Sequence, residues 1–211
     1  IYIIYNYLFK FYYYIYIMKI AMLISGRAVR YEVCLLPILK QANYHEIDLF
    51  ISVNDENDDC PYYNKMKLDL KPWLKGCIIK KFIIPEDFFY IFDKTKNSST
   101  NQFINNKWVP YNVLSMLYND NHSYNMALEY SKKKSVKYDI FMKFRSDIMD
   151  CTIPKELPYT NNLHLYSVVP LCNFQCWILG KKELGLTRII SDAWVWGNED
   201  TMKIYCNAYD Y

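Results

Sequence analysis

Short apolar runs recur along the chain, and polar residues, glycine or proline end them. Four runs have the length of strands, at residues 19–24, 47–53, 77–84 and 138–144. The run at 138–144 is apolar on both alternating faces apart from two positions, as expected of a strand buried inside a sheet. We therefore predict four principal strands. Further strand candidates are residues 163–169 and 174–179.

Segments between these runs have helical spacing. Val33, Leu36 and Leu39 recur at the spacing of one helix face after the first run. A longer helix is predicted to start at Pro110, because proline suits the first turn of a helix. The lysines at 132–134 would end it, where positive charge complements the helix dipole. The positions predicted to form its buried face are Val113, Leu114, Leu117, Leu128 and Tyr130.

The last segment carries the signals of a helix start. Asn198 can cap the first turn, and Glu199 and Asp200 place negative charge at the positive end of the helix dipole. The apolar stripe that follows consists of Met202, Tyr205, Cys206 and Tyr209. No stop signal follows this stripe, which leaves open a natural chain that continues beyond residue 211.

Strands that alternate with helices predict an α/β fold with a mostly parallel central sheet flanked by helices. The 211 residues are 52% apolar and 22% charged, as in ordinary globular domains, and we expect residues 18–211 to form one domain. A formal charge of +3 is too small for a dedicated nucleic-acid binder, so no nucleic-acid partner is expected. The seven scattered cysteines contain no Cys-x-x-Cys pair and signal neither a disulfide framework nor a zinc site.

Residues 1–17 differ from the rest of the chain. They hold seven of the 22 tyrosines, and Asn6 and Lys10 interrupt their apolar residues. Tyrosine prefers the membrane interface, so this extension fits a membrane-spanning helix poorly. Two alternatives stay open: the extension anchors the protein at a membrane, or the natural chain starts at Met18. The expected location is the cytoplasm, with membrane anchoring as the alternative.

Polar groups follow three of the predicted strands: Ser25-Gly26-Arg27, Asn54-Asp55 and Ser146-Asp147. If these strands are parallel neighbours, the groups share the carboxyl edge of the sheet, where open α/β sheets bind ligands. Gly26 would let backbone N–H groups approach a phosphate, and Arg27 or Arg30 would hold it. The alternative is a structural turn with a solvated arginine.

Asp147 is the candidate ligand for a metal ion. A carboxylate at a strand end suits a hard divalent cation, Mn²⁺ or Mg²⁺, which would neutralise a diphosphate leaving group. The alternative is that Asp147 pairs with Arg145 or caps a turn.

Five runs carry a family resemblance in their order along the chain: KIAMLISGRAVRYE, IDLFISVND, NVLSMLYN, YDIFMKFRSDI and ISDAWVWGNEDTMKIYCNAYDY. From Met18 onward the chain resembles nucleotide-sugar glycosyltransferases of the GT-A kind, the type found in bacterial polysaccharide clusters and large DNA viruses. The resemblance implies a Rossmann-like nucleotide-sugar-binding fold. It also implies transfer of a sugar from a nucleotide-diphosphate donor to a glycan or protein acceptor.

The resemblance further implies roles for particular residues. The donor-binding residues would be Ser25, Gly26, Arg27, Arg30, Asn54, Asp55 and Arg145. Arg145 and Asp147 match the family's metal-binding acidic motif, but Arg145 stands where an Asp-x-Asp motif has its first aspartate, which leaves metal dependence open. Asp192 would be catalytic, either as general base or as the carboxylate that orients the acceptor. Trp194 and Trp196 would stack on an acceptor sugar or, as large aromatic residues more commonly do, pack in the core.

Two other functions stay open. A catalytically inactive remnant, or a binding module of the same fold, would keep the sheet but lack a working acidic motif. A membrane-associated accessory protein would use residues 1–17 as its anchor.

Overall fold

The computed structural model describes residues 17–26, 30–55, 60–83, 102–104, 107–109, 111–145, 153, 155, 157, 166–167 and 194–207. The elements within them are β1 (Lys19–Gly26), α2 (Leu35–Gln41), β2 (Glu46–Val53), α3 (Pro61–Asp69), β3 (Leu74–Ile79), β4 (Gln102–Ile104), β5 (Lys107–Val109), α4 (Tyr111–Lys134), β6 (Ile140–Phe144), β7 (Tyr166–Ser167), β8 (Trp194–Gly197) and α5 (Glu199–Cys206). They form an α/β fold with a mostly parallel central sheet flanked by helices, which confirms the predicted fold class at this level.

The main sheet has six strands in the order β3-β2-β1-β6-β8-β7. β1 pairs in parallel with β2 on one side and with β6 on the other, and β3 continues the parallel part beyond β2. β8 runs antiparallel to both of its neighbours, β6 and β7. β4 and β5 pair with each other in a separate antiparallel ribbon.

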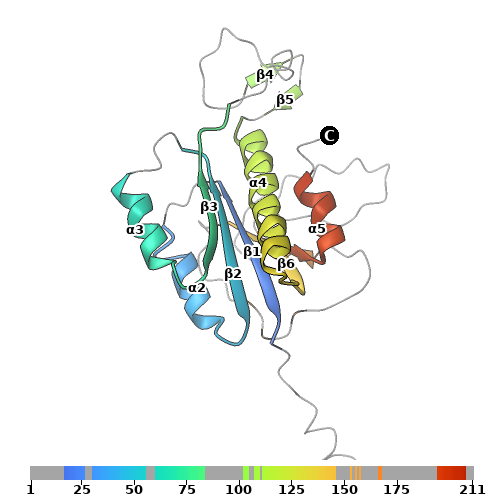
Figure 1. Ribbon diagram of the computed structural model, residues 1–211. Coiled ribbons are helices and arrows are strands. Elements are labelled where there is room, and N and C mark those ends of the chain that lie inside the picture. Colours follow the sequence, from blue (N-terminus) through green and yellow to red (C-terminus); the bar gives the residue numbers. More distant parts are fainter. Residues whose placement is uncertain are drawn as a thin grey trace, which may run out of the picture.

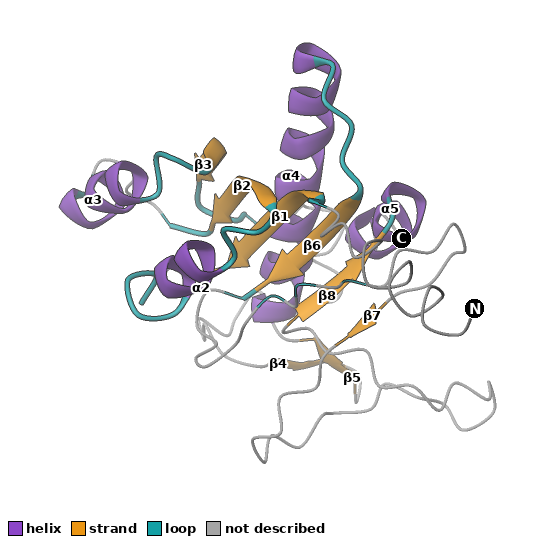
Figure 2. Cartoon of the chain, turned by 90° about the horizontal axis from the view of Figure 1, so that it is seen from below, coloured by secondary structure: helices purple, strands orange, loops and turns teal. Residues whose placement is uncertain are grey.

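Helices cover both faces of the main sheet. Figures 1 and 2 show α2 and α3 on one face, with α4 and α5 on the other. Successive residues of a strand point to opposite faces, so Met22 packs toward α2 and α3 while Leu23 packs toward α4. The core therefore has two layers, one on each side of the strands, and β1 is buried in both.

The strands at the centre of the sheet were predictable. β1, β2 and β6 confirm three of the four apolar runs. The fourth run was misplaced, because β3 begins at Leu74 and ends at Ile79. The Lys80 N–H donates to the Val53 carbonyl, and beyond this residue the chain leaves the sheet. β7 falls inside the predicted run at 163–169, whereas the candidate strand at 174–179 lies outside the described residues.

Four of the described elements were not predicted: α3, β8 and the two strands of the ribbon, β4 and β5. α3 follows an acidic loop, although Pro61 occupies its first turn and Tyr63, Met66 and Leu70 are buried at helical spacing. β8 has only four residues, too few to show a periodic pattern. α3 packs against the sheet and β8 pairs with β6 and β7, so tertiary contacts rather than a strong local signal hold both.

The predicted helices are all present, but the buried faces of α2 and α4 differ from the predicted ones. Asn198 caps α5 as predicted, because its side-chain oxygen accepts the Thr201 N–H at 2.8 Å. α2 begins only at Leu35, after a turn, so Val33 precedes the helix and is 58% exposed. The prediction that Val33 faces the core was therefore wrong. The helix buries Leu35, Ile38 and Leu39 instead.

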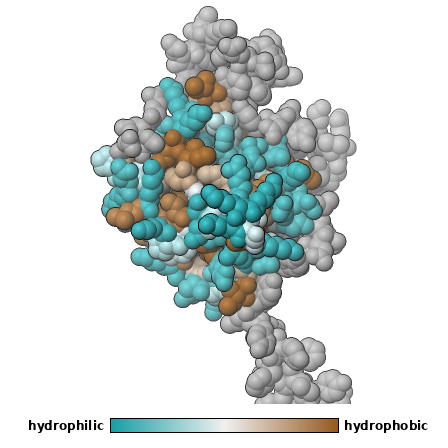
Figure 3. Space-filling view, viewed as in Figure 1, coloured by the Kyte–Doolittle hydropathy of each residue, from teal (hydrophilic) through white to brown (hydrophobic). Residues whose placement is uncertain are grey.

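Large apolar side chains that remain exposed belong to separate parts of the described chain: Ile17, Val33, Leu68, Ile83 and Ile204. Figure 3 shows apolar groups on one face separated by hydrophilic ones. No helix within the described residues combines length with apolar character in the way that crossing a bilayer requires. Residues 1–16, which carry the anchoring alternative, lie outside the described residues, so that alternative stays a prediction.

The end of α4 generates a stability prediction. Ser135 follows the last helical residue with a φ of 53°, a left-handed conformation that favours glycine. Ser135→Gly should therefore raise the free energy of unfolding by about 1 kcal/mol, measured by urea denaturation. Lys134→Gly is the matched control: one residue earlier and still helical, it should lower stability by about 1 kcal/mol. Equal effects of the two substitutions would contradict this explanation.

Candidate functional site at the carboxyl edge of the sheet

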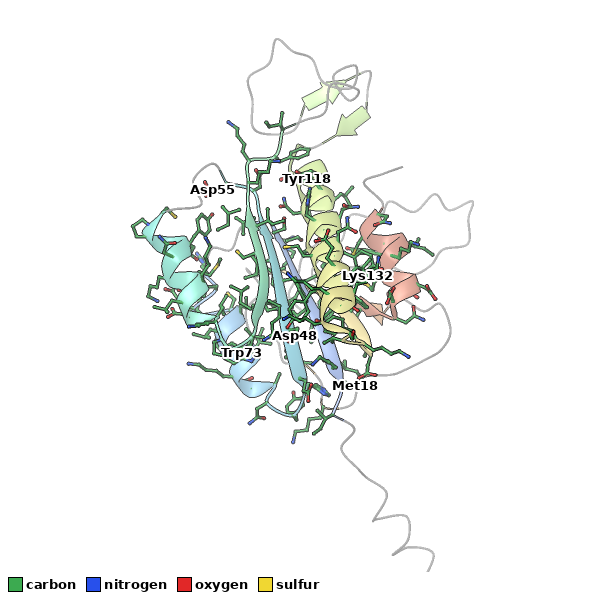
Figure 4. All side chains as sticks on the ribbon, in the orientation of Figure 1. Met18, Asp48, Asp55, Trp73, Tyr118 and Lys132 are labelled. Atoms are coloured by element: carbon green, nitrogen blue, oxygen red, sulfur yellow. The ribbon has the colours of Figure 1, made fainter. Side chains whose placement is uncertain are left out.

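The ends of β1, β2 and β6 lie side by side at one edge of the sheet. In register, Gly26 lies opposite Val53, and Ile24 lies opposite Phe144. Asn54-Asp55 and Arg145, which directly follow β2 and β6, are therefore neighbours of the end of β1. The three strands are parallel neighbours, as the prediction required, but Arg27, Ser146 and Asp147 lie outside the described residues, so the meeting of the three predicted polar groups stays a prediction. Figure 4 places Asp55 and Tyr118 at this edge and Met18 at the opposite one.

The order of the strands reverses at the same edge. The chain moves outward from β1 through β2 to β3, and then α4 returns it to β6 on the other side of β1. In open α/β sheets such a reversal separates the loops that follow two adjacent strands, and ligands bind in the crevice between them. The described residues at this reversal are Gly26, which ends β1, and Arg145, which directly follows β6.

The predicted site residues divide into those that the structure describes and those that it does not. Arg27, Asp147 and Asp192 lie outside the described residues, so their roles stay predictions. Gly26 ends β1 in the predicted place. Arg30 is exposed and has a φ of 67°, a rare conformation for a residue with a side chain.

Asn54 links three parts of the edge. Its Nδ2 donates to the Ser115 Oγ at 2.7 Å, and its Oδ1 accepts the Phe82 N–H at 2.7 Å. Both ends of the amide thus join the end of β2 to α4 and to the segment after β3. Asp55 accepts a hydrogen bond from the Tyr63 hydroxyl of α3 at 2.6 Å. These contacts give Asn54 and Asp55 a framework role that the sequence did not indicate.

The first half of α4 presents polar side chains to the sheet, contrary to the predicted apolar face. Its buried polar residues are Ser115, Asn119, Asp120 and Ser123. Leu117, Leu128 and Tyr130 are only half-buried, and the side chains of Val113 and Leu114 are outside the description. The polar face is hydrogen-bonded: Ser52 Oγ donates to Asn119 Oδ1 at 2.7 Å, and Asn119 Nδ2 donates to the Ser115 carbonyl at 2.6 Å.

A buried lysine lies next to this polar face. Lys143 of β6 is 0% exposed, and its Nζ lies 3.0 Å from Asp120 Oδ2. The same Nζ donates to the Tyr205 hydroxyl of α5 at 3.1 Å. Burial by itself would lower the pKa of Lys143, but the Asp120 carboxylate and Tyr205 outweigh it, and the pKa lies above its usual value. Lys143 is therefore charged in the core.

The same surroundings affect two neighbours on α5. Burial, offset in part by the charge of Lys143, raises the pKa of Tyr205 to about 12. Burial and the nearby Asp120 raise the pKa of the Cys206 thiol well above its usual value. Both groups are therefore protonated at neutral pH, which makes Cys206 a packing residue rather than a nucleophile.

Ser25 has an incomplete hydrogen-bond shell. Its side chain is on the face of the sheet that carries α4, is only 5% exposed, and its Oγ makes no hydrogen bond with any residue that the structure describes. Ser52, its register partner on β2, is bonded to Asn119. A buried hydroxyl without a partner is costly, so the end of β1 offers an unused hydrogen-bonding group where the strand order reverses.

Trp194 and Trp196 belong to the core. They are 4% and 6% exposed and lie on the same face of β8, where the Trp194 ring packs edge-on against Phe144 at a centroid distance of 5.9 Å. Of the two alternatives, packing is the one observed. Within the described residues, no three His, Cys, Asp or Glu side chains gather in an arrangement that could hold a metal ion.

Comparison with known proteins adds no family assignment. The chain matches no family model and no curated protein sequence.

A histidine beside this edge generates a pH prediction. His122 of α4 packs against Tyr118 with ring centroids 4.2 Å apart, and burial together with the charge of Lys80 lowers its pKa below 6.5. The folded state thus favours neutral His122, so its contribution to stability is complete above pH 6.5 and is lost as the pH falls toward the folded-state pKa.

We expect wild-type protein to lose stability between about pH 7.5 and pH 5.5, and His122→Gln to lose less over the same interval. Urea denaturation at both pH values measures the difference. Parallel pH dependence of the two proteins would show that His122 does not contribute.

Proposed function

We propose that the chain binds a nucleotide-diphosphate sugar at the carboxyl edge of β1 and β6 and transfers its sugar to a glycan or protein acceptor. The observation that carries the proposal is the strand-order reversal between β1 and β6, flanked by Arg145 and by the Ser25 hydroxyl, which has no hydrogen-bond partner among the described residues. A reversal of this kind is where open α/β sheets bind nucleotides. The family resemblance of the sequence supports the same ligand class.

In this proposal the diphosphate lies across the ends of the two strands. Arg145, directly after β6, makes a charge-assisted contact with a phosphate oxygen, and Ser25 gains the hydrogen-bond partner that the described part of the chain does not give it. Arg27 and Arg30, in the segment after β1, are further candidates for phosphate contact. Positive side chains at this edge stabilise the negative charge that grows on the diphosphate as the sugar departs.

The proposal assigns a divalent cation to Asp147. A carboxylate is the ligand type that Mn²⁺ and Mg²⁺ prefer, and Asp147 follows the end of β6 by three residues. When bound, the cation neutralises charge on the leaving diphosphate. Arg145 stands where the family's motif has its first aspartate and supplies a fixed positive charge of its own. Asp192 is the proposed base or acceptor-orienting carboxylate.

A binding module without catalysis is the second candidate. The observation that favours it is Arg145 itself, because an arginine in place of an aspartate removes one carboxylate from the proposed metal site. Such a module would bind the same ligands at the same edge. Release or transfer of the sugar distinguishes an enzyme from this module.

The decisive experiment measures binding. Thermal unfolding and calorimetry with UDP-sugars and GDP-sugars, with and without Mn²⁺, should show that at least one donor stabilises the protein, by about 2.7 kcal/mol at one hundred times its Kd. Arg145→Ala should weaken that binding about tenfold or more, because a charge-assisted contact is lost. Asp147→Ala should abolish any additional stabilisation by Mn²⁺.

Lys137→Ala is the control, because Lys137 is an exposed cation just before β6, at the opposite edge of the sheet. It should bind the donor like wild type. A flat response of wild-type protein to all donors would refute the proposed function, and equal losses in Arg145→Ala and Lys137→Ala would refute the proposed place of binding.

A further inference from the structure

Lys143 joins three elements inside the protein. It belongs to β6, its ion-pair partner Asp120 belongs to α4, and the hydroxyl that it contacts belongs to Tyr205 of α5. Lys143 and Asp120 are both fully buried. The Tyr205 ring lies under the ammonium as well, with Nζ 5.4 Å from its centroid.

Stability alone does not explain a buried pair of this kind. Removing two charges from water costs more than their attraction generally returns, and well-packed apolar residues of similar volume often serve as well or better. Unlike an apolar contact, an ion pair depends on orientation, because the ammonium group of Lys143 must point at both the carboxylate and the hydroxyl. Contacts among the three residues therefore join α4 and α5 to β6.

The position of Lys143 connects this arrangement to the carboxyl edge. Lys143 contacts α4 and α5 from near the end of β6, and Arg145 follows two residues later, directly after the strand. Leu23 is the register partner of Lys143, and Ser25 comes two residues after Leu23. Lys143 of the buried pair thus lies two residues before Arg145, and its register partner Leu23 lies two residues before Ser25.

A second group of charges provides a contrast. Asp48 accepts the Tyr138 hydroxyl and lies near Lys19 and Lys75, but this group sits at the amino edge of the sheet. The side chains of Lys19 and Lys75 are 30% and 28% exposed, so water solvates both ammonium groups. Of these two groups in the described residues, the one around Lys143 has its ion pair fully buried and lies next to the proposed ligand-binding edge.

We propose that Lys143, Asp120 and Tyr205 are positioning residues that set the place of Arg145 for the diphosphate of the donor. The inference rests on the proposed function, because Arg145 is the group that would touch the ligand. The three residues act through β6 and contact no ligand themselves.

The test compares two Tyr→Phe variants. Tyr205→Phe removes the hydroxyl that contacts Lys143, whereas Tyr124→Phe removes a hydroxyl that donates to the Glu199 carbonyl and links α4 to α5 elsewhere. Both lose one interaction between buried elements. The probe is the UDP-sugar or GDP-sugar that stabilises wild-type protein, and calorimetry gives its Kd for each variant.

Tyr205→Phe should weaken donor binding by roughly twofold to thirtyfold, the range for residues that act on a site without contact, while Tyr124→Phe binds like wild type. In a transfer assay the loss in Tyr205→Phe should appear in KM. Equal Kd values for the two variants, or equal losses that follow their melting temperatures, would overturn the inference.

A charge-free replacement separates positioning from stability. The double variant Lys143→Met with Asp120→Leu removes both buried charges together and should fold with a melting temperature near that of wild type. It should bind the donor more weakly than wild-type protein does, because an apolar pair does not impose a fixed orientation on the side chains. Wild-type affinity in this variant would overturn the proposal.

One readout is independent of the donor. Hydrogen exchange at the amides of Phe144 and Arg145 should be faster in Tyr205→Phe than in Tyr124→Phe, while exchange at Ile140 stays unchanged in both. If wild-type protein binds no nucleotide sugar, the proposed function fails and exchange alone decides whether Tyr205 orders the end of β6. Unchanged exchange there would overturn the positioning role as well.

Discussion

The parallel pairing of β1 with both β2 and β6 is the constraint on which the rest of the structure depends. β1 is bonded on both sides and buried on both faces, so it has no freedom to shift. Its register places three strand ends at one level, and it forces each connection between parallel strands to cross a face of the sheet. The covering helices and the crowded carboxyl edge both follow from that one arrangement.

α4 illustrates how a single helix adapts to two environments. Toward its end, Tyr124 and Ala127 pack on Phe141 and its apolar neighbours in the ordinary way. Toward its start, Ser115 and Asn119 form hydrogen bonds around the end of β2. α4 therefore packs through apolar contacts near the amino edge of the sheet and through hydrogen bonds near the carboxyl edge. These hydrogen bonds order the carboxyl edge without apolar side chains.

The parts of the fold that could be predicted are those with a local signal. Nearly continuous apolar runs marked the central strands, and the cap and charges around Asn198 marked α5. The inner face of α4 could not be read in this way, because Asp120 looks like a solvent-exposed residue until its partner Lys143, 23 positions further along, is placed beside it. Ion pairs between distant segments leave no trace in periodicity. For the same reason the sequence identified Asn54 as a residue of the edge but not its two bonds to Ser115 and Phe82.

In the main sheet as described, β8 is the strand that runs antiparallel to its neighbours, and its direction fixes where α5 begins. Because β8 is antiparallel to β6, it ends near the amino edge of the sheet, and α5 begins there. Just after α5, the Asn207 side chain accepts a hydrogen bond from Asn121 of α4 at 3.3 Å. β1 begins at the amino edge of the sheet, where the Met18 carbonyl accepts the Glu46 N–H. A tether attached at Ile17 would therefore hold the domain at the amino edge of the sheet, roughly 26 Å of strand away from the carboxyl edge where Gly26 ends β1.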